Sequence, residues 1–244
     1  MYCTLTVLFQ IEKKIIISIL LFHVIINIRR LLKFMDGIFF DLDGTLWNAI
    51  PQMVEAYNEA MQENGYKYTF DYKKVKSYMG LTPEETAVLA FKDVPLEKGM
   101  ALFKLMYEKE LVYLRKTPGI LYPNVERVLS ILSKKYPLYI VSNADKGYIE
   151  AFLEGTKLDK YFKGHLAAGD TNLAKWQNIN LLQEKEKIDR VIYVGDTNKD
   201  KIESLKANAM FIHAAYGFGI IENDEYKIDS LDELPDLIDN LFNK

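Results

Sequence analysis

Two aspartates separated by a single residue, Asp41 and Asp43, directly follow an apolar run of the sequence. Carboxylates beside a buried hydrophobic strand cost free energy unless another group compensates their charge. Asp196 and Asp200 follow a later apolar run, and their spacing of four residues places them on one face if a helix begins there. Carboxylate oxygens with room for water suit Mg²⁺. These residues therefore predict a magnesium site, provided that the fold brings the two pairs together.

The apolar runs have the composition of buried strands, rich in β-branched and aromatic residues and ended by polar ones. Four runs fit well and a fifth, at 164–170, is weaker; the four are 37–41, 137–143, 190–196 and 209–215. Because they lack apolar–polar alternation, we expect both faces of the sheet to be covered. Helical patterns lie between them at 124–135, 145–155 and 175–186. This alternation predicts a doubly wound, Rossmann-like parallel α/β sheet.

A segment without any buried strand pattern, residues 50–117, interrupts this alternation. We expect three helices in it: one closed by Gly65 with Pro51 near its first turn, one started by the Thr-Pro-Glu-Glu of residues 82–85, and a long one ended before Pro118. The sequence thus predicts an all-helical domain at 50–117 inserted into an α/β core made of 35–49 and 118–244. The core is expected to end in a short strand and a helix capped by Ser230.

Ligands of an open parallel sheet bind outside the carboxyl ends of its strands. This rule adds Ser142 and Asn143, at the end of the second predicted strand, to the aspartates. An EF-hand is excluded because Leu46 and Gln52 stand where that loop needs glycine and glutamate. A nucleotide-binding glycine loop is also excluded, since the chain has neither GxGxxG nor a Walker A lysine. The plain alternative for the first acidic motif is a polar turn after a strand, where Asp-Gly is common.

Four motifs in order resemble those of the haloacid dehalogenase superfamily, specifically phosphatases of the phosphoglycolate phosphatase kind with a helical C1-type cap. DLDGT at 41–45 is similar to the nucleophile motif, Ser142-Asn143 to the phosphate-binding motif, Lys175 to the motif lysine, and GDTNKD at 195–200 to the metal motif. The resemblance extends from about Asp36 to the C-terminus. The predicted helical insertion falls where the cap of this family belongs.

The resemblance implies a role for each motif residue. Asp41 would be the nucleophile that forms an aspartyl-phosphate, and Asp43 the general acid and then the general base. Asp41, Asp43 and Asp196 would hold Mg²⁺, while Asp200 would act through water or by orienting the lysine.

The phosphate contacts follow from the same resemblance. Lys175 would neutralise charge, Ser142 would hold phosphate oxygens, Asn143 would offer an amide donor, and Thr45 would support the nucleophile loop. The family often has proline after the lysine, whereas Trp176 follows here, so a surface lysine at a helix start is the alternative. For Ser142 and Asn143 the alternative is a helix cap.

Other residues are expected around the substrate. Trp47 and Asn48, just after the nucleophile loop, are candidates for contact with the leaving group, while residues 78–82 form either a substrate-facing cap loop or a plain helix–helix turn. The aromatic side chains Tyr57, Tyr107 and Tyr113 are expected in the core of the cap.

These observations predict a Mg²⁺-dependent phosphatase acting on a small phosphorylated metabolite. Alternatives are a phosphosugar mutase of the β-phosphoglucomutase kind, a pyrophosphatase or a nucleotidase, and a non-enzymatic binding module. No histidine occurs between His23 and His165, which counts against the mutase because those enzymes carry one in the cap linker. Because all four motif aspartates are present, a binding module is the weakest alternative.

Composition and the N-terminus limit the partners and the location. A formal net charge of −3 and the lack of an arginine-rich tract argue against nucleic acid, and Cys3 alone forms neither an internal disulfide nor a cysteine zinc site. The apolar stretch 15–28 is shorter than the ~18–20 residues of a spanning helix. We expect residues 1–34 to be dispensable or to precede a natural start at Met35; the alternative is that they form a membrane anchor. We also expect the protein to be cytoplasmic.

Overall fold

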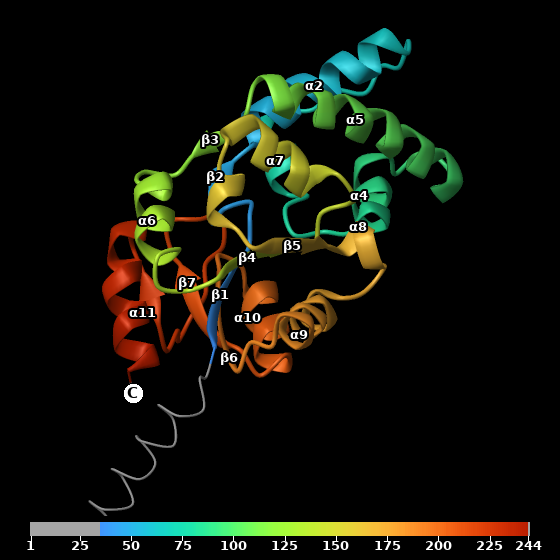
Figure 1. Cartoon of the computed structure of the whole chain (residues 1–244). Helices are drawn as coiled ribbons and strands as arrows, with labels where there is room; N and C mark the ends of the chain where they lie inside the picture. Colours follow the sequence, from blue (N-terminus) through green and yellow to red (C-terminus); the bar gives the residue numbers. More distant parts are fainter. Residues whose placement is uncertain (1–34, 244) are drawn as a thin grey trace, which may run out of the picture. The chain divides into compact units, whose positions relative to one another are not determined.

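The computed structural model describes residues 35–243, and those from Asp36 onward form one compact unit (Figure 1). The predictions about residues 1–34 lie outside the described residues. Within the described part of the chain, no helix combines the length and the apolarity that crossing a bilayer requires.

A six-stranded parallel sheet forms the centre of this unit, in the order β5-β4-β1-β6-β7-β8. Its strands are β1 (Asp36–Phe40), β4 (Leu138–Ser142), β5 (Gly164–Ala167), β6 (Arg190–Gly195), β7 (Met210–Ala214) and β8 (Lys227–Ile228). The predicted strands are therefore confirmed. The weak fifth candidate is shorter than expected, because the chain turns after Ala167 into a short helix, α8 (Ala168–Thr171), where Asp170 accepts a hydrogen bond from the Ala167 N–H.

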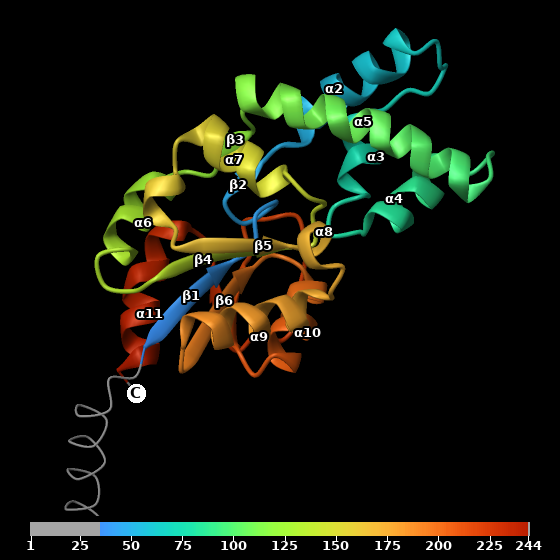
Figure 2. The same ribbon diagram turned by 45° about the vertical axis from the view of Figure 1, so that its right-hand side comes forward.

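Successive residues of β1 point to opposite faces of the sheet, and both faces are covered as predicted. Ile38 and Phe40 belong to a core that includes α6 (Val125–Leu132), α7 (Tyr148–Thr156) and α11 (Leu234–Phe242). Phe39, between them, belongs to a second core with α9 (Lys175–Glu186) and Ala207, which directly follows α10 (Asn198–Lys206). Figure 2 shows α9 and α10 on the side of the sheet opposite to α11. The doubly wound α/β architecture is thus confirmed.

The segment between β2 (Trp47–Asn48) and β3 (Ile120–Leu121) contains helices and the loops between them, and no strand; we call it the helical insertion (residues 50–117). It contains α2 (Ile50–Glu63), α3 (Tyr72–Lys76), α4 (Pro83–Ala90) and α5 (Leu96–Lys116). Pro51 lies in the first turn of α2, and Thr82 starts α4 with a capping box closed by Glu85, as expected. The five-residue α3 escaped prediction because it is too short to show helical periodicity; Asp71 caps it.

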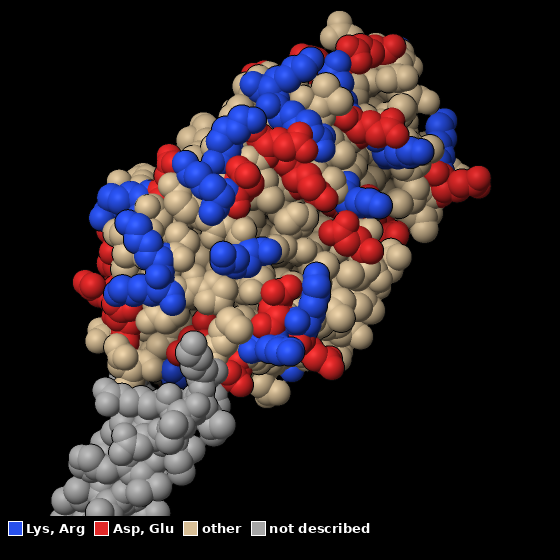
Figure 3. Space-filling model, viewed as in Figure 1, with Lys and Arg blue, Asp and Glu red and all other residues tan. Residues whose placement is uncertain are grey.

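Two short strands join the helical insertion to the sheet domain. β2 (Trp47–Asn48) and β3 (Ile120–Leu121) pair antiparallel, so the chain enters and leaves the insertion at neighbouring points. Neither strand was predicted, since two residues carry no periodic signal. Figures 1 and 2 place the helices of the insertion beyond the carboxyl end of β1, with α5 alongside α7. On the face drawn in Figure 3, basic and acidic side chains are interspersed.

Candidate active site

Three of the four motif aspartates meet at the carboxyl ends of β1 and β6. The Asp41 N–H donates to the Val194 carbonyl at 2.8 Å, which fixes the start of the loop against β6. One carboxylate oxygen from each of Asp41, Asp196 and Asp200 lies within 4.8 Å of the other two. The side chain of Asp43 is not in this group; it accepts a hydrogen bond from the Tyr148 hydroxyl at 2.9 Å.

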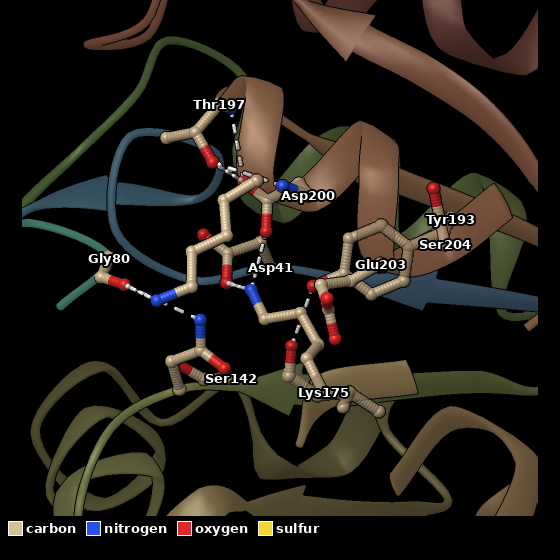
Figure 4. Close-up of polar contacts among 12 residues, drawn as sticks. Asp41, Gly80, Ser142, Lys175, Tyr193, Thr197, Asp200, Glu203 and Ser204 are labelled. Atoms are coloured by element: carbon tan, nitrogen blue, oxygen red, sulfur yellow. Dashed lines mark hydrogen bonds and ion pairs between the residues drawn. The ribbon is translucent and has the colours of Figure 1, made fainter. Parts of the chain in front are cut away.

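Lys175 bridges two of these carboxylates. It is the first residue of α9, and its Nζ lies 2.7 Å from Asp41 Oδ1 and 2.5 Å from Asp200 Oδ1 (Figure 4). Only 3% of its side chain is exposed, so the surface-lysine alternative is wrong. Burial by itself lowers the pKa of Lys175, but Asp200 and Asp41 outweigh it and hold the pKa well above its usual value. The side chain is therefore a buried cation.

Trp176, the departure from the family pattern after the lysine, has a structural reason. Its backbone N–H donates to Glu203 Oε2 at 3.2 Å, linking the first turn of α9 to α10. Proline has no N–H and cannot make this bond. With Trp176 in this place, Lys175 still reaches Asp41 and Asp200, so the departure from the family pattern does not displace the lysine.

Asp200 is held by the start of its own helix. Thr197 caps α10: its hydroxyl accepts from the Asp200 N–H at 3.2 Å, while Asp200 Oδ2 accepts from the Thr197 N–H at 3.0 Å. The other carboxylate oxygen, Oδ1, faces Lys175 (Figure 4). This arrangement supports the expectation that Asp200 orients the lysine.

Asp196 is the aspartate with spare coordinating capacity. It is fully buried; Oδ2 accepts from the Phe218 N–H at 2.7 Å, and Oδ1 has no hydrogen-bond partner among the described residues. A Cβ at Gly44, where φ is +83°, would come within 2.1 Å of Oδ2, so the DLDGT glycine is required for the loop to pass Asp196. Burial, then Asp41 and Asp200, raise the pKa of Asp196 to about 8. A divalent cation is the group that would compensate such a carboxylate.

The two aspartates of the first motif have different pKa values. Burial raises the pKa of Asp41 to about 6 against the opposing effect of Lys175. Burial and then the charge of Asp41 raise the pKa of Asp43 to about 7. Two carboxyl groups of unequal pKa suit one ionised and one protonated role near neutral pH.

The predicted phosphate contacts differ in how they are placed. Ser142 and Asn143 both line the cavity described below, and the helix-cap alternative does not apply, because Gly147 is the N-cap of α7. The Ser142 hydroxyl accepts from the Ala144 N–H at 3.2 Å. Thr45 is fully buried, and its hydroxyl has no partner among the described residues; its carbonyl accepts from the Tyr216 hydroxyl at 2.8 Å.

A cavity lies between these strand ends and the helical insertion. Asp41, Asp43 and Lys175 line it from the sheet, and residues 78–81 line it from the insertion. The loop at 78–82 is thus more than a plain turn. Gly80 has φ of +77°, and its carbonyl accepts from Lys199 Nζ at 2.9 Å, a contact that joins the insertion to α10 (Figure 4).

Several aromatic expectations need correction. Trp47 is fully buried against Tyr148 and Phe152, and neither it nor Asn48 lines the cavity. Tyr57 is buried in the hydrophobic core and Tyr107 packs against that core, as expected, but both also line the cavity. Trp47 misses the cavity because the sharp turn after Asp43 directs the side chains of Leu46 and Trp47 into the core. Tyr113 hydrogen-bonds Glu55 instead of packing in the core.

Glu110 is a cavity-lining acid that the sequence reasoning missed. It is 1% exposed on α5, Oε2 accepts from the Tyr57 hydroxyl at 2.8 Å, and Oε1 has no partner among the described residues. Burial raises the pKa of Glu110 to about 8. The available signal was an acid within the buried apolar stripe of α5, between Met106 and Leu114.

Glu110 should make the stability of the fold depend on pH. Its pKa is raised above the unfolded value, so its contribution is fully present below pH ~4.5 and is lost as the pH rises through about 8. Between pH 4.5 and pH 8.5 the wild type should therefore lose several kcal/mol of its free energy of unfolding through this group. Glu110→Gln has no titrating carboxyl at this position, so we expect it to lose that much less than the wild type over the same pH range. Urea titrations at both values measure this. Glu108→Gln, at an exposed position of the same helix, is the control; equal pH dependence in all three proteins contradicts the assignment.

The fold and the site define an α/β enzyme with a helical insertion over buried carboxylates and a lysine. The chain belongs to the haloacid dehalogenase-like hydrolases, because the model of that family matches residues 38–214. The resemblance inferred from the four motifs is thereby confirmed.

Individual relatives agree with this assignment. The chain is 28% identical over 220 residues to a phosphoglycolate phosphatase from Vibrio parahaemolyticus, covering 82% of this chain and 94% of that protein. Among solved structures, a haloacid dehalogenase-like hydrolase from Streptococcus pneumoniae superimposes with a TM-score of 0.71 at 21% identity, covering 84% and 98% of the two chains. A predicted phosphoglycolate phosphatase from Haemophilus somnus gives 0.69 at 20% identity, covering 84% and 98%. These structures share the fold.

Proposed function

We propose that this hydrolase is a Mg²⁺-dependent phosphatase that cleaves a small phosphate monoester through an aspartyl-phosphate on Asp41. The observation that carries the proposal is the buried Lys175 joining Asp41 to Asp200 at the floor of a cavity that Asp43 also lines. Family membership and the similarity to phosphoglycolate phosphatases support a phosphoric monoester as the substrate class.

In the first half-reaction, an Asp41 oxygen attacks phosphorus and the bond from phosphorus to the alcohol oxygen breaks. Asp43, whose pKa is raised to about 7, gives its proton to the departing alcohol. Lys175 offsets the repulsion between the Asp41 carboxylate and the phosphate, since it is already within hydrogen-bond distance of Asp41. The products are an alcohol, aspartyl-phosphate at Asp41 and ionised Asp43.

In the second half-reaction, Asp43 accepts a proton from water, and the water oxygen attacks the phosphorus of the aspartyl-phosphate. The bond to Asp41 breaks, which releases phosphate and restores both aspartates. Tyr148 donates a hydrogen bond to Asp43 Oδ1 and holds that carboxyl in place during both proton transfers.

A divalent cation fits the donor set of this site. Asp41 and Asp196 would hold it, and the unpartnered Oδ1 of buried Asp196 supports this assignment. Asp200 belongs to the same cluster, but both of its oxygens already accept hydrogen bonds. A metal role for the Asp43 side chain stays a prediction, since that side chain lies outside the cluster. When bound, the cation would neutralise charge on the transferring phosphoryl group.

The remaining residues serve binding and enclosure. Ser142 and Asn143 are placed along the cavity to hold phosphate oxygens, while Thr45 supports the loop through its carbonyl bond with Tyr216. The helical insertion acts as the cap that excludes water, and its paired linkers β2 and β3 are the natural hinge.

Hydrolysis of p-nitrophenyl phosphate by the full chain tests the proposed function. We expect turnover with Mg²⁺ and at least ~100-fold less with a chelator, because the buried carboxylates then lack a counterion for the phosphate. Turnover that persists unchanged in the chelator excludes the metal mechanism. Absence of turnover with Mg²⁺, for this ester and for a panel of small phosphate esters, excludes phosphatase activity and returns weight to the mutase alternative.

A further inference from the structure

The side chains that line the cavity have an unusual charge balance. Among the described residues that line the cavity, five are acidic and one, Lys175, is basic; the acids are Asp41, Asp43, Glu110, Asp145 and Asp200. Lys175 is already engaged with two of these carboxylates. The helical insertion adds Glu110 and no lysine or arginine to the lining.

Glu110 is the acidic side chain that the insertion contributes to the cavity. Tyr57 occupies Oε2, and Oε1 is buried and unpartnered next to the cavity. A buried carboxyl oxygen without a partner costs free energy that a ligand can recover by donating a hydrogen bond. Burial also raises the pKa of Glu110 to about 8, so the carboxyl is neutral below that pH and becomes an anion above it.

Most other insertion side chains along the cavity are apolar or aromatic, including Met53, Phe103 and Tyr107, and Thr86 and the tyrosines add only uncharged hydroxyl groups. Such a surface contacts carbon atoms and offers a carboxylate no cationic side chain. An anionic leaving group would therefore be buried beside acids without a compensating cation.

From these features we propose that the leaving alcohol is neutral or cationic and donates an O–H or N–H hydrogen bond to Glu110, so that anionic alcohols such as glycolate are disfavoured. This inference rests on the proposed phosphatase function and specifies its substrate class. Glu110 is thus a specificity-determining residue, separate from the phosphoryl-transfer residues at the sheet.

Three two-carbon esters that differ only in the charge of one end test the inference: 2-aminoethyl phosphate, 2-hydroxyethyl phosphate and 2-phosphoglycolate. Each competes with p-nitrophenyl phosphate in Mg²⁺-loaded full-length protein, and the inhibition constant ranks them even if turnover is slow. At pH 9, where Glu110 is ionised, we expect the inhibition constant of phosphoglycolate to exceed that of aminoethyl phosphate by about 10-fold or more, since like charges would be buried together. In Glu110→Gln the difference should fall to about threefold or less, while Glu108→Gln should keep the wild-type ranking.

The outcomes separate this inference from the proposed function. Tightest binding of phosphoglycolate to the wild type, with p-nitrophenyl phosphate turnover intact, overturns the substrate class alone. The wild-type ranking tests the substrate class without any variant. Glu110→Asp, which keeps the carboxyl, is the second variant to compare if Glu110→Gln misfolds. An unchanged ranking in a folded Glu110→Gln protein overturns the role of Glu110. Failure of p-nitrophenyl phosphate turnover itself overturns the proposed function.

Discussion

Replacing Asp41 by asparagine should reduce turnover of p-nitrophenyl phosphate by at least ~10³-fold, because the amide cannot form the aspartyl-phosphate. The fold should survive, since Lys175 keeps its second partner, Asp200, at 2.5 Å. The expected protein is therefore folded, inactive and unlabelled after brief exposure to a ³²P-labelled ester, whereas wild type carries an acid-stable, base-labile phosphate. Initial rates, circular dichroism and acid-quenched labelling measure the three properties.

Asp36→Asn is the matched control for this substitution. Asp36 lies at the opposite end of the same strand and pairs with Arg190, so the change removes an acid and an ion pair without reaching the cavity. Its turnover should stay within a few-fold of wild type. If Asp41→Asn turns over the ester at a rate close to that of Asp36→Asn, the nucleophile is a residue other than Asp41.

The sheet and its strand-end residues were predictable because each depends on a short local pattern. The β-branched runs mark the strands, and the parallel topology brings their ends together regardless of chain distance. Lys175 and Asp41 are 134 residues apart and yet adjacent, which no local pattern shows. Their pairing was inferable only from the ordered motifs of a family.

The residues that shape the cavity were not predictable for the same reason. Trp47 follows the DLDGT loop (41–45) in sequence, but the turn after Asp43 buries it against α7. Glu110 and Tyr57 reach the cavity only because α2 packs against α5 over the strand ends. Such placement depends on tertiary packing, and helical periodicity alone assigns both residues to a buried face.

Replacing Lys175 by methionine should have two separable effects. Turnover should fall by orders of magnitude, about 10³-fold, because the phosphate and Asp41 lose their shared cation. The free energy of unfolding without metal should fall by about 3–5 kcal/mol at pH 7.5, because two buried carboxylates are left without their partner. Methionine keeps an unbranched chain of similar length beside the Tyr193 ring, which lies 5.5 Å from Nζ, so the loss of charge dominates. Lys185→Met, on the exposed face of the same helix, is the control.

The pH dependence of the stability effect has a definite sign. Lys175 is the strongest opponent of the effect of burial on Asp41, so without it the folded pKa of Asp41 rises further above the unfolded value. The stability that this group contributes is present at low pH and lost as the pH rises, and the deficit of Lys175→Met should therefore be smaller at pH 5 than at pH 7.5. Adding Asp200→Asn removes one of the stranded charges and should recover most of the stability but none of the turnover. Recovery of both would make Lys175 a structural residue, whereas recovery of stability alone identifies its charge as part of the chemistry.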